Sequence, residues 1–315
     1  MKSVAITGIS GYVGQQLLHK LAEQEEVERI VGIDVKPPDS DSPKLKFYSR
    51  DIRAPFKDIL AENKVDTAVH LAFVVTPTRN TDAARDININ GSRNFLDSCA
   101  QASVEQVLYL SSHTAYGAHP DNPIPIKEDA PLRPLPNFRY SCEKAEVEQM
   151  FQEFVEQHPS VCVTIFRACA IVGPRAGTAG VNVLFTPIMM RPLGYNAPWQ
   201  FIHEDDLMES FYRVLAQRQR GVYNIGGDGY VPYKEMIAAA GKPCIVLPAA
   251  LLRFIVALTW RLHLQSRSPA GIEFMQYPII VDAEKLQKTT GYRFTHSSRE
   301  ALMSLISAVR PGSQR

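Results

Sequence analysis

The segment Tyr140-Ser-Cys-Glu-Lys144 places a tyrosine and a lysine at a spacing that suits proton transfer. Residues four apart lie on the same face of a helix, so the phenol and the ammonium would be neighbours. A tyrosine with a pKa of about 10 is a poor base at neutral pH, but a nearby cation stabilises its phenolate. Such a tyrosine exchanges a proton with a substrate oxygen while hydride moves to or from a nicotinamide.

Ser111-Ser112 supplies a hydroxyl for the same chemistry. The pair ends the apolar run 107–110, and ligands of open α/β sheets bind at the carboxyl ends of the strands. Ser112 would hydrogen-bond the substrate oxygen, and helix capping or turn formation is the alternative. A second Tyr-x-x-x-Lys pair, Tyr230 and Lys234, has a proline inside it and follows a Gly-Gly turn, so we interpret it as incidental.

A glycine-rich turn, Thr7-Gly8-Ile9-Ser10-Gly11-Tyr12-Val13-Gly14, predicts a phosphate site. Its glycines permit a tight turn and close approach to a pyrophosphate, and the following helix N-terminus attracts the anion. Asp34 comes twenty residues after Gly14, where a carboxylate accepts hydrogen bonds from the adenosine ribose. It would repel a 2′-phosphate, so the sequence favours NAD over NADP. Lys36, two residues further on, would be the partner of that phosphate in NADP.

The elements that must position these residues alternate along the chain. Apolar runs typical of strands are Ser3–Thr7, Arg29–Ile33, Thr67–Leu71, Val107–Leu110 and Val161–Phe166. Helical spacing covers Tyr12–Ala22, Asp82–Gln101 and Tyr140–Gln157. The uniformly apolar strands indicate a sheet covered on both faces, and the alternation predicts an α/β fold with a doubly wound parallel sheet. Asp51-Ile52 follows a third strand, where an adenine pocket needs a polar group beside an apolar one.

After Pro174 the sequence changes character, with more Gly, Pro and Met and a weaker alternation. We therefore expect an NAD-binding domain at 1–173, to which 199–229 returns, and a smaller, less regular substrate-binding part at 174–315. The segment 117–136 carries six prolines and is predicted to be irregular.

Composition narrows the class of protein. The chain has 315 residues, 45% of them apolar, with 34 Lys and Arg against 33 Asp and Glu. A formal net charge of +1 argues against a nucleic-acid binder that depends on counterion release. Five scattered cysteines without a C-x-x-C motif favour a reduced, cytoplasmic protein with no disulfide or zinc site. We expect no signal peptide and no membrane span.

One apolar segment, 247–262, contains Arg253 and Arg261, eight residues apart. Such a segment could lie in a membrane interface. We interpret it instead as a buried helix of the substrate domain.

Further motifs follow those above in a fixed order. They are His70-Leu71-Ala72, Asn88-Ile-Asn-Gly91, Ser111-Ser112-x-x-x-Tyr116-Gly117, Arg167 through Gly173-Pro174, Phe201-Ile-His-Glu-Asp-Asp206, Tyr223-Asn-Ile-Gly-Gly227, Asp282-x-x-Lys285, Gly291-Tyr292 and Ser298-Arg-Glu-Ala-Leu302. Over nearly the whole chain this order resembles the extended short-chain dehydrogenases/reductases, the NAD-dependent epimerase/dehydratase family. The resemblance implies a Rossmann domain that holds NAD, and a catalytic set of Ser112, Tyr140 and Lys144.

The resemblance also implies roles toward the cofactor. Lys144 would bind the nicotinamide ribose as well as tune Tyr140, Ala72 would lie along the cofactor, and Asn88 would lie on the helix beneath the site. The cofactor-binding residues expected in this way are Gly8, Ser10, Gly11, Tyr12, Val13, Gly14, Asp34, Asp51, Ile52, Leu71, Ala72, Asn88, Tyr140, Lys144 and Arg167.

Family members often pair through the two helices that correspond to 82–101 and 140–157, so we expect a homodimer. The second helix offers more apolar surface than packing on one side of a sheet requires. Its apolar residues are Val147, Met150, Phe151, Phe154 and Val155.

The residues after Ser112 depart from the dehydratases of this family. Those enzymes carry an Asp-Glu pair there, and this chain has His113 and Thr114, so dehydration is not expected. His113 could relay a proton, with a solvent-facing histidine at a strand end as the alternative. Both residues are candidate substrate contacts.

Two positions depart from the sugar-nucleotide enzymes. An asparagine usually stands four residues before Gly-Pro, where this chain has Ala170, and an arginine precedes Phe201-Ile-His, where none is found. The arginines left to hold a diphosphate are Arg175, Arg191 and Arg267. An apolar pocket that suits an alcohol or ketone is expected from Phe185, Met189, Met190 and Trp199.

No metal site is predicted. Asp205 and Asp206 have no third ligand at a suitable spacing and are interpreted as charges at a helix N-terminus. His203 is expected to cap the same helix alongside Asp205.

Three classes of function remain. The first is an NAD-dependent oxidoreductase that moves hydride between nicotinamide and a secondary alcohol or ketone. The second is a nucleotide-sugar epimerase, which oxidises and re-reduces a sugar without net use of NAD. The third is a catalytically inactive NAD-binding regulatory protein, against which the intact Ser112, Tyr140 and Lys144 argue. Ala170 and the missing arginine favour net redox chemistry.

Overall fold

The computed structural model describes residues 1–75, 81–176, 184, 186–262 and 269–309. Its residues form two compact units, each described by itself. Unit 1 consists of Met1–Ser111, Glu143–Arg167 and Met208–Tyr223, and unit 2 of Ser112–Cys142, Ala168–Leu207 and Asn224–Arg315.

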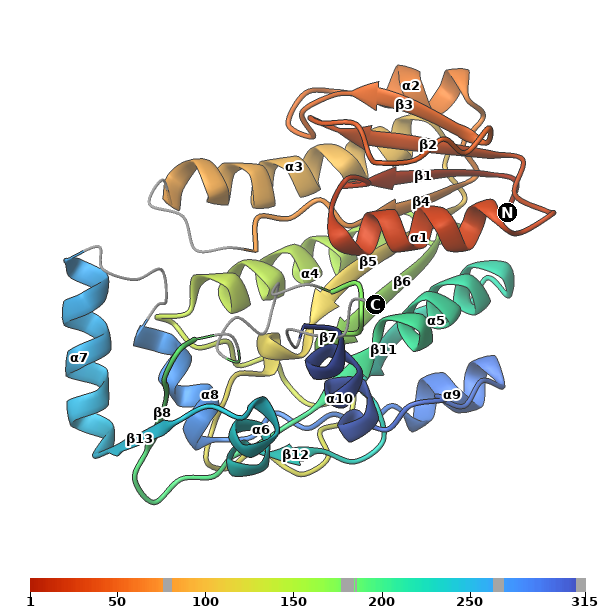
Figure 1. Cartoon of the computed structure of the whole chain (residues 1–315). Coiled ribbons are helices and arrows are strands. Elements are labelled where there is room, and N and C mark those ends of the chain that lie inside the picture. Colours follow the sequence, from red (N-terminus) through yellow and green to blue (C-terminus); the bar gives the residue numbers. More distant parts are fainter. Residues whose placement is uncertain (76–80, 177–183, 185, 263–268, 310–315) are drawn as a thin grey trace. The chain divides into compact units, whose positions relative to one another are not determined.

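The main sheet has seven strands in the order β11-β6-β5-β4-β1-β2-β3 (Figure 1). The strands are β1 (Ser3–Thr7), β2 (Arg29–Asp34), β3 (Leu45–Ser49), β4 (Thr67–His70), β5 (Gln106–Ser112), β6 (Cys162–Ala168) and β11 (Gly221–Ile225). β1 pairs in parallel with β2 and β4, and the pairs β2–β3 and β4–β5 are parallel too. The predicted doubly wound α/β fold is therefore confirmed.

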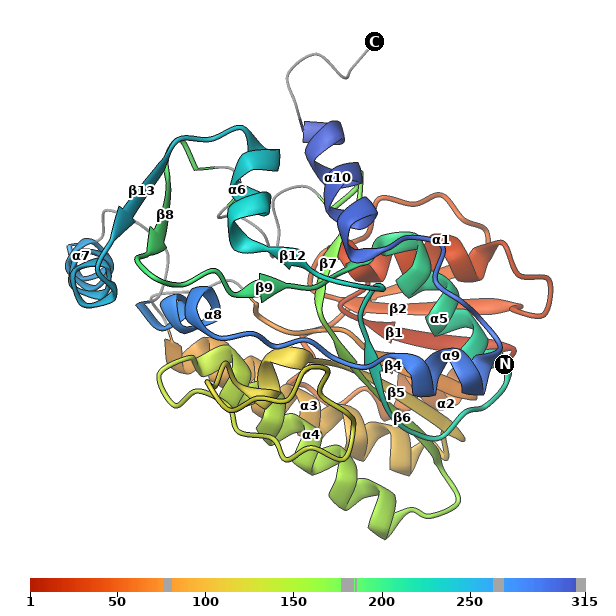
Figure 2. The same ribbon diagram turned by 90° about the horizontal axis from the view of Figure 1, so that it is seen from below.

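Helices cover both faces of this sheet. They are α1 (Tyr12–Ala22), α2 (Lys57–Glu62), α3 (Thr81–Gln101), α4 (Arg139–Gln157) and α5 (Glu204–Ala216). α1 lies on one face, and α3 and α4 lie side by side on the other (Figure 2). All residues of β1, β4 and β6 are buried, as expected for strands covered on both sides.

The core under α3 and α4 changes the argument for a dimer. Val147, Phe151 and Phe154 of α4 are buried against residues of the sheet such as Val107 and Tyr109. They are therefore not spare surface, and only Met150 and Val155 of the five apolar residues are partly exposed. The homodimer stays a prediction, without that support.

Unit 2 contains short paired strands and short helices. The strand pairs are β7 (Ala170–Val172) with β10 (Phe201–His203), β9 (Pro198–Trp199) with β12 (Val231–Pro232), and β8 (Met189–Pro192) with β13 (Cys244–Leu247). The helices are η1 (His113–Tyr116), α6 (Tyr233–Ala240), α7 (Ala249–Arg261), η3 (Pro269–Ile272), α8 (Glu273–Gln276), α9 (Glu284–Thr290) and α10 (Ser298–Val309). The proline-rich segment 117–136 forms only an isolated bridge at Ile126.

The prediction that 247–262 forms a buried helix is wrong. The segment is helical as α7, but Leu252 is its only buried residue. An apolar sequence predicts that a helix packs against other apolar groups, but it does not indicate that those groups belong to the same chain. Within the described residues, no helix is long and apolar enough to cross a membrane.

Candidate active site

The glycine-rich turn joins β1 to α1 and is packed too closely for side chains. Gly8 has a φ of +72°, and a Cβ there would lie 2.5 Å from the backbone nitrogen of Ala72. At Gly14 a Cβ would lie 2.3 Å from the Gly8 carbonyl oxygen. α1 begins at Tyr12 after Gly11, and no side chain caps it. The turn therefore fits a pyrophosphate, which approaches backbone at a helix N-terminus.

Asp34, at the end of β2, is joined to this turn. Its Oδ2 accepts a hydrogen bond from the Ser10 N–H at 3.1 Å, and its Oδ1 accepts one from the Val35 N–H at 2.7 Å. The Ser10 hydroxyl donates to the Lys36 carbonyl oxygen. The Asp34 carboxylate therefore contacts the backbone of the glycine-rich turn.

Asp51 and Ile52 follow β3, as predicted. Asp51 Oδ2 lies 2.6 Å from Arg53 Nη2, and Arg53 Nη1 also lies 2.7 Å from Asp86 Oδ2. Ile52 is buried. Sequence reasoning missed Arg53 because its pairing with Asp86 depends on how α3 packs.

The backbone after β4 is fixed by Asn88 of α3. Its Oδ1 accepts a hydrogen bond from the Val74 N–H at 2.7 Å, and its Nδ2 donates to Glu143 Oε2 at 2.7 Å. Asn88 and Glu143 are both buried. Asn88 therefore holds the backbone that follows Leu71 and Ala72, and its place beneath a cofactor site stays a prediction. Glu143 was missed, although its place next to Lys144 was a signal.

Lys144 is buried on α4. Its Nζ donates to the Leu110 carbonyl oxygen of β5 at 2.6 Å and lies 3.8 Å from the centre of the Phe73 ring. Burial lowers the pKa of Lys144 to about 7, and Glu148 one turn further along opposes that shift. The ammonium is therefore poised between its charged and neutral forms near neutral pH.

Glu148 lies at the centre of a buried polar cluster. Its Oε2 accepts a hydrogen bond from Ser111 Oγ at 3.0 Å, and its Oε1 accepts one from Arg167 Nε at 2.9 Å. Arg167 is thus held in an ion pair at the end of β6, and its contact with a cofactor stays a prediction. Sequence reasoning missed Glu148, which stands four residues after Lys144.

The Ser112 hydroxyl lies close enough to the Tyr140 phenol to lower the pKa of the phenol through a side-chain hydrogen bond. Ser112 Oγ also accepts hydrogen bonds from the Thr114 N–H at 3.2 Å and from Thr114 Oγ1 at 2.9 Å. Burial raises the pKa of Tyr140 to about 12, and the bond with Ser112 acts in the opposite direction. Ser112 caps η1, so the capping alternative is correct and does not prevent the contact with Tyr140.

His113 does not face solvent as the alternative interpretation held. It is half-buried, and its Nδ1 donates to the Ala168 carbonyl oxygen at 3.1 Å. Burial lowers the pKa of His113 to about 4. The ring is therefore neutral at physiological pH, with Nε2 left as a hydrogen-bond acceptor.

A sequence model of the NAD dependent epimerase/dehydratase family matches residues 4–226. The chain belongs to this family. An uncharacterized protein of Mycobacterium tuberculosis is 25% identical over 308 residues, which cover 95% of this chain and 82% of that protein. The UDP-glucose 4-epimerase of Yersinia enterocolitica is 26% identical over 274 residues, 72% of this chain and 79% of the enzyme.

Solved structures of the epimerase/dehydratase family share the fold. The dTDP-glucose 4,6-dehydratase of Bacillus anthracis, in complex with NAD, gives a TM-score of 0.75 at 17% identity over 98% of this chain and 96% of that one. The UDP-glucose 4-epimerase of Thermotoga maritima, with UDP-glucose, gives 0.75 at 18% identity over 97% and 98%.

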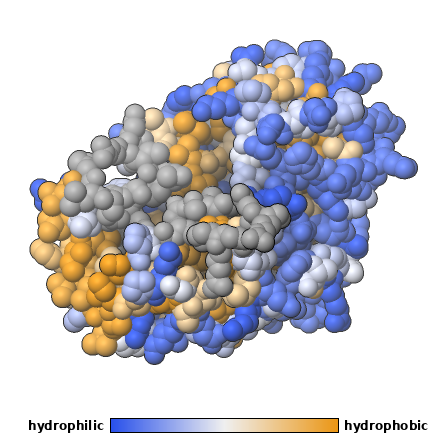
Figure 3. Space-filling view, in the orientation of Figure 1, coloured by the Kyte–Doolittle hydropathy of each residue, from blue (hydrophilic) through white to orange (hydrophobic). Residues whose placement is uncertain are grey.

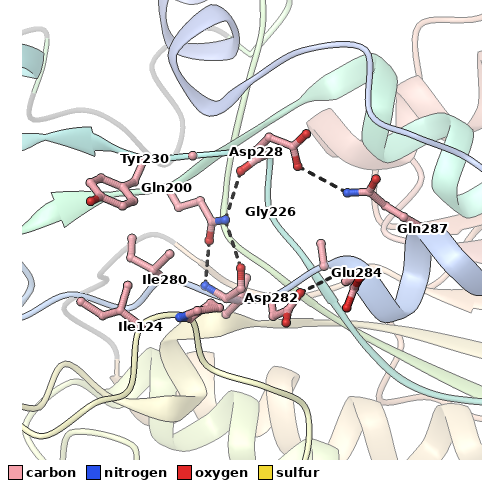
Figure 4. A pocket seen from close by; sticks show the side chains of 14 residues that line it. Ile124, Gln200, Gly226, Asp228, Tyr230, Ile280, Asp282, Glu284 and Gln287 are labelled. Atoms are coloured by element: carbon pink, nitrogen blue, oxygen red, sulfur yellow. Dashed lines mark hydrogen bonds between the residues drawn. The ribbon is translucent and has the colours of Figure 1, made fainter.

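Within this family fold, the position before Phe201 has a structural role in this chain. The Gln200 amide donates to the carbonyl oxygens of Gly227 and Val281, both at 3.1 Å, and accepts from the Val281 N–H at 2.9 Å. Gln200 also lines a cavity of about 350 Å³ with Asp228 and Gln287 (Figure 4). None of the predicted site residues lines that cavity.

Two of the three arginines that could bind a diphosphate have partners within this chain, and the third lies outside the described residues. Arg175 pairs with Glu204 at 3.1 Å and with Asp205. Arg191 Nη1 donates to the Tyr195 carbonyl oxygen at 3.2 Å. Arg267 lies outside the described residues.

Only part of the expected apolar pocket lies within the described residues. Trp199 donates from Nε1 to the Phe274 carbonyl oxygen at 3.0 Å, Met189 is buried in β8, and Met190 is half-buried. Ala170 begins β7 and is half-buried. Phe185 lies outside the described residues, so the pocket stays a prediction.

The segment after β10 agrees with its predicted structural role. His203 Nδ1 accepts a hydrogen bond from the Asp205 N–H at 3.2 Å, which caps α5 as predicted. Asp206 is more than a helix charge, because it is buried and accepts hydrogen bonds from Tyr292, Thr295 and His296. The described residues contain no group of three side chains that could hold a metal.

Proposed function

We propose that this chain is an NAD-dependent oxidoreductase that transfers hydride between nicotinamide and a secondary alcohol or ketone. The observation that carries the proposal is that Tyr140 lies close to the Ser112 hydroxyl and stands one turn before Lys144 on α4. This pair of hydroxyls would bind one substrate oxygen. Membership of the NAD dependent epimerase/dehydratase family supports the proposal.

The cofactor would be held by the residues around the glycine-rich turn. The N-terminus of α1 would bind the pyrophosphate, and Asp34 would accept hydrogen bonds from the adenosine ribose. Asp51 and Ile52 would contact the adenine. Bound NAD would supply the hydride acceptor or donor. Because Asp34 already lies against Ser10, a 2′-phosphate would bring a second negative charge next to its carboxylate, which favours NAD over NADP.

Tyr140 would handle the proton. With a pKa of about 12 it is protonated at neutral pH, so it would donate to the carbonyl oxygen as the ketone is reduced. In the direction of alcohol oxidation the same phenol oxygen takes the proton back. Lys144 in its charged form would stabilise the phenolate, and Ser112 would orient the substrate oxygen.

Nucleotide-sugar epimerisation is the second candidate. Similarity to the UDP-glucose 4-epimerase of Yersinia enterocolitica favours it, and the same three side chains would serve it. Two residues argue against epimerisation. Gln200 stands where sugar-nucleotide enzymes usually have an arginine, and it is hydrogen-bonded to the backbone. Arg175 is paired with the carboxylates of Glu204 and Asp205. A buried diphosphate without cations is strongly unfavourable.

The test is turnover by the Tyr140→Phe variant. With NADH and a panel of ketones, we expect turnover to fall by about 10²–10⁴-fold while calorimetry shows unchanged NAD affinity. The matched control is Tyr230→Phe, in the second Tyr-x-x-x-Lys pair, which should keep full activity. Full turnover by Tyr140→Phe would disprove the assigned role. Interconversion of UDP-sugars without net change in NADH would instead establish the epimerase.

A further inference from the structure

The surface around α7 and β13 concentrates exposed hydrophobic side chains. Fourteen large hydrophobic residues are exposed in the described part of the chain, and nine of them fall between residues 188 and 262. Eight of these nine, all except Tyr230, lie in or next to β8, β13 and α7. These eight, here called the α7 face, are Ile188, Leu193, Ile245, Val246, Leu251, Phe254, Leu258 and Leu262. Hydrophobic residues gather over α7 and β13 in Figure 3. Scattered exposed residues need no explanation, but a contiguous patch marks an interaction surface.

The pattern on α7 itself is one-sided. Leu251, Phe254, Leu258 and Leu262 recur at spacings of three and four, which places them in one stripe along the helix. Phe254 is 63% exposed and Leu262 is 56% exposed. The buried Leu252 points to a different side, toward the part of unit 2 that contacts the helix. The stripe is therefore the outer side of α7.

The sequence segment 236–272, which contains this stripe, carries charges of one sign. Between Glu235 and Glu273 the sequence contains no aspartate or glutamate, whereas it contains four cations: Lys242, Arg253, Arg261 and Arg267. Arg253 pairs with Glu273 at 3.2 Å. Arg261 is exposed at the last turn of α7, on the same side of the helix as Phe254 and about two turns further along. In a chain with a net charge of only +1, this segment is distinctly basic.

A second copy of the chain is a poor occupant for such a face. In a two-fold dimer the same patch meets itself, so the acid-free basic segments of both copies would meet. Like charges brought together at an interface are unfavourable. An apolar stripe with Arg261 on its side of the helix, in a segment without acids, instead matches an anionic lipid surface, which takes up the hydrophobic side chains and attracts the cation.

We propose that the α7 face docks on a membrane that contains anionic lipids, with α7 lying in the plane of the interface. Leu251, Phe254, Leu258 and Leu262 enter the headgroup boundary, and Arg261 pairs with lipid phosphates or carboxylates. The helix lies on the bilayer and does not cross it. This proposal does not depend on the activity proposed above.

The test is co-sedimentation of the full chain with vesicles of phosphatidylcholine, with and without phosphatidylserine. We expect binding only when phosphatidylserine is present, with lower binding at higher salt. Phe254→Ser combined with Leu258→Ser should reduce partitioning by about tenfold or more. Arg261→Ala should reduce it about fivefold. Met303→Ser, which removes an exposed apolar side chain on α10, is the matched control and should bind like the wild type.

Each other outcome overturns the proposal. Absence of vesicle binding by the wild type excludes a lipid surface, and equal binding to both vesicle types excludes recognition of anionic lipid. If light scattering gives a wild-type dimer that the double variant loses, and no vesicle binding occurs, the α7 face is covered by a second copy. Circular dichroism of each variant checks its fold, and Arg261→Ala keeps the proposal testable should the double variant unfold.

Discussion

The Lys144 ammonium donates a hydrogen bond of 2.6 Å to the backbone carbonyl oxygen of Leu110, two residues before Ser112 on β5. This bond fixes the lysine of α4 to the strand whose end carries the serine. Tyr140 stands one turn before Lys144 on the same helix. The position of Lys144 therefore depends on the packing of α4 against β5.

Replacing Lys144 by methionine should change how stability depends on pH. The pKa of Lys144 falls from an ordinary value of 10.5 to about 7 in the folded chain. Between pH 7 and pH 10.5 this lysine is protonated in the unfolded chain and largely neutral in the folded chain. The free energy of unfolding therefore rises by up to about 1.4 kcal/mol per pH unit in this range. Urea unfolding at several pH values should show this rise relative to Lys144→Met. Parallel curves would contradict it, and Lys234→Met, at an exposed position, is the control.

Replacing Asp34 by alanine should narrow the preference for NAD over NADP. The carboxylate beside the Ser10 N–H would no longer repel a 2′-phosphate, and the hydrogen bonds to the adenosine ribose would be lost. Calorimetric titration of both cofactors measures the ratio of their dissociation constants. Tighter binding of NADP by the wild type would overturn the assignment.

Replacing Asn88 by alanine should destabilise unit 1. The change leaves the Val74 N–H and the buried Glu143 carboxylate without this partner, and an unsatisfied buried polar group costs about 1–3 kcal/mol. Urea unfolding measures the loss. Asn90→Ala, two residues along α3 at an exposed position, is the matched control and should cost much less. An equal effect of both substitutions would show that Asn88 has no special role.

Uridine diphosphate should neither stabilise the protein nor compete with its substrate. Arg175 is held by Glu204 and Asp205, and Gln200 is bonded to backbone groups. Calorimetry with uridine and thymidine diphosphates in the presence of NAD tests this. Micromolar binding that Arg191→Ala or Arg267→Ala abolishes would reverse the ranking in favour of the epimerase.

Local patterns predicted the first elements closely. The ranges Ser3–Thr7 and Tyr12–Ala22 match β1 and α1 at both ends, because the glycine-rich turn defines where the strand stops and the helix starts. β3 is not among the apolar runs, since at the edge of the sheet none of its residues is buried. Periodicity detects a covered strand far better than an edge strand.

Partners from distant segments could not be predicted from the sequence. Glu143 and Glu148 are acidic residues in an ordinary helical pattern, and only the packing of α4 shows that both are buried. The exposure of α7 could not be predicted either, because an apolar helix has the same sequence pattern whether protein or solvent surrounds it. Contacts between distant parts of the chain decide both cases.

The contacts of Asp206 constrain how this sequence can vary among related proteins. Its carboxylate accepts hydrogen bonds from the Tyr292 hydroxyl and from the backbone N–H groups of Thr295 and His296, more than eighty residues away. A lineage that shortened or rerouted the chain before α10 would leave this buried carboxylate without those donors. Among relatives, the identity of residue 206 should therefore covary with the presence and length of the 292–296 segment, independently of the substrate that each relative uses.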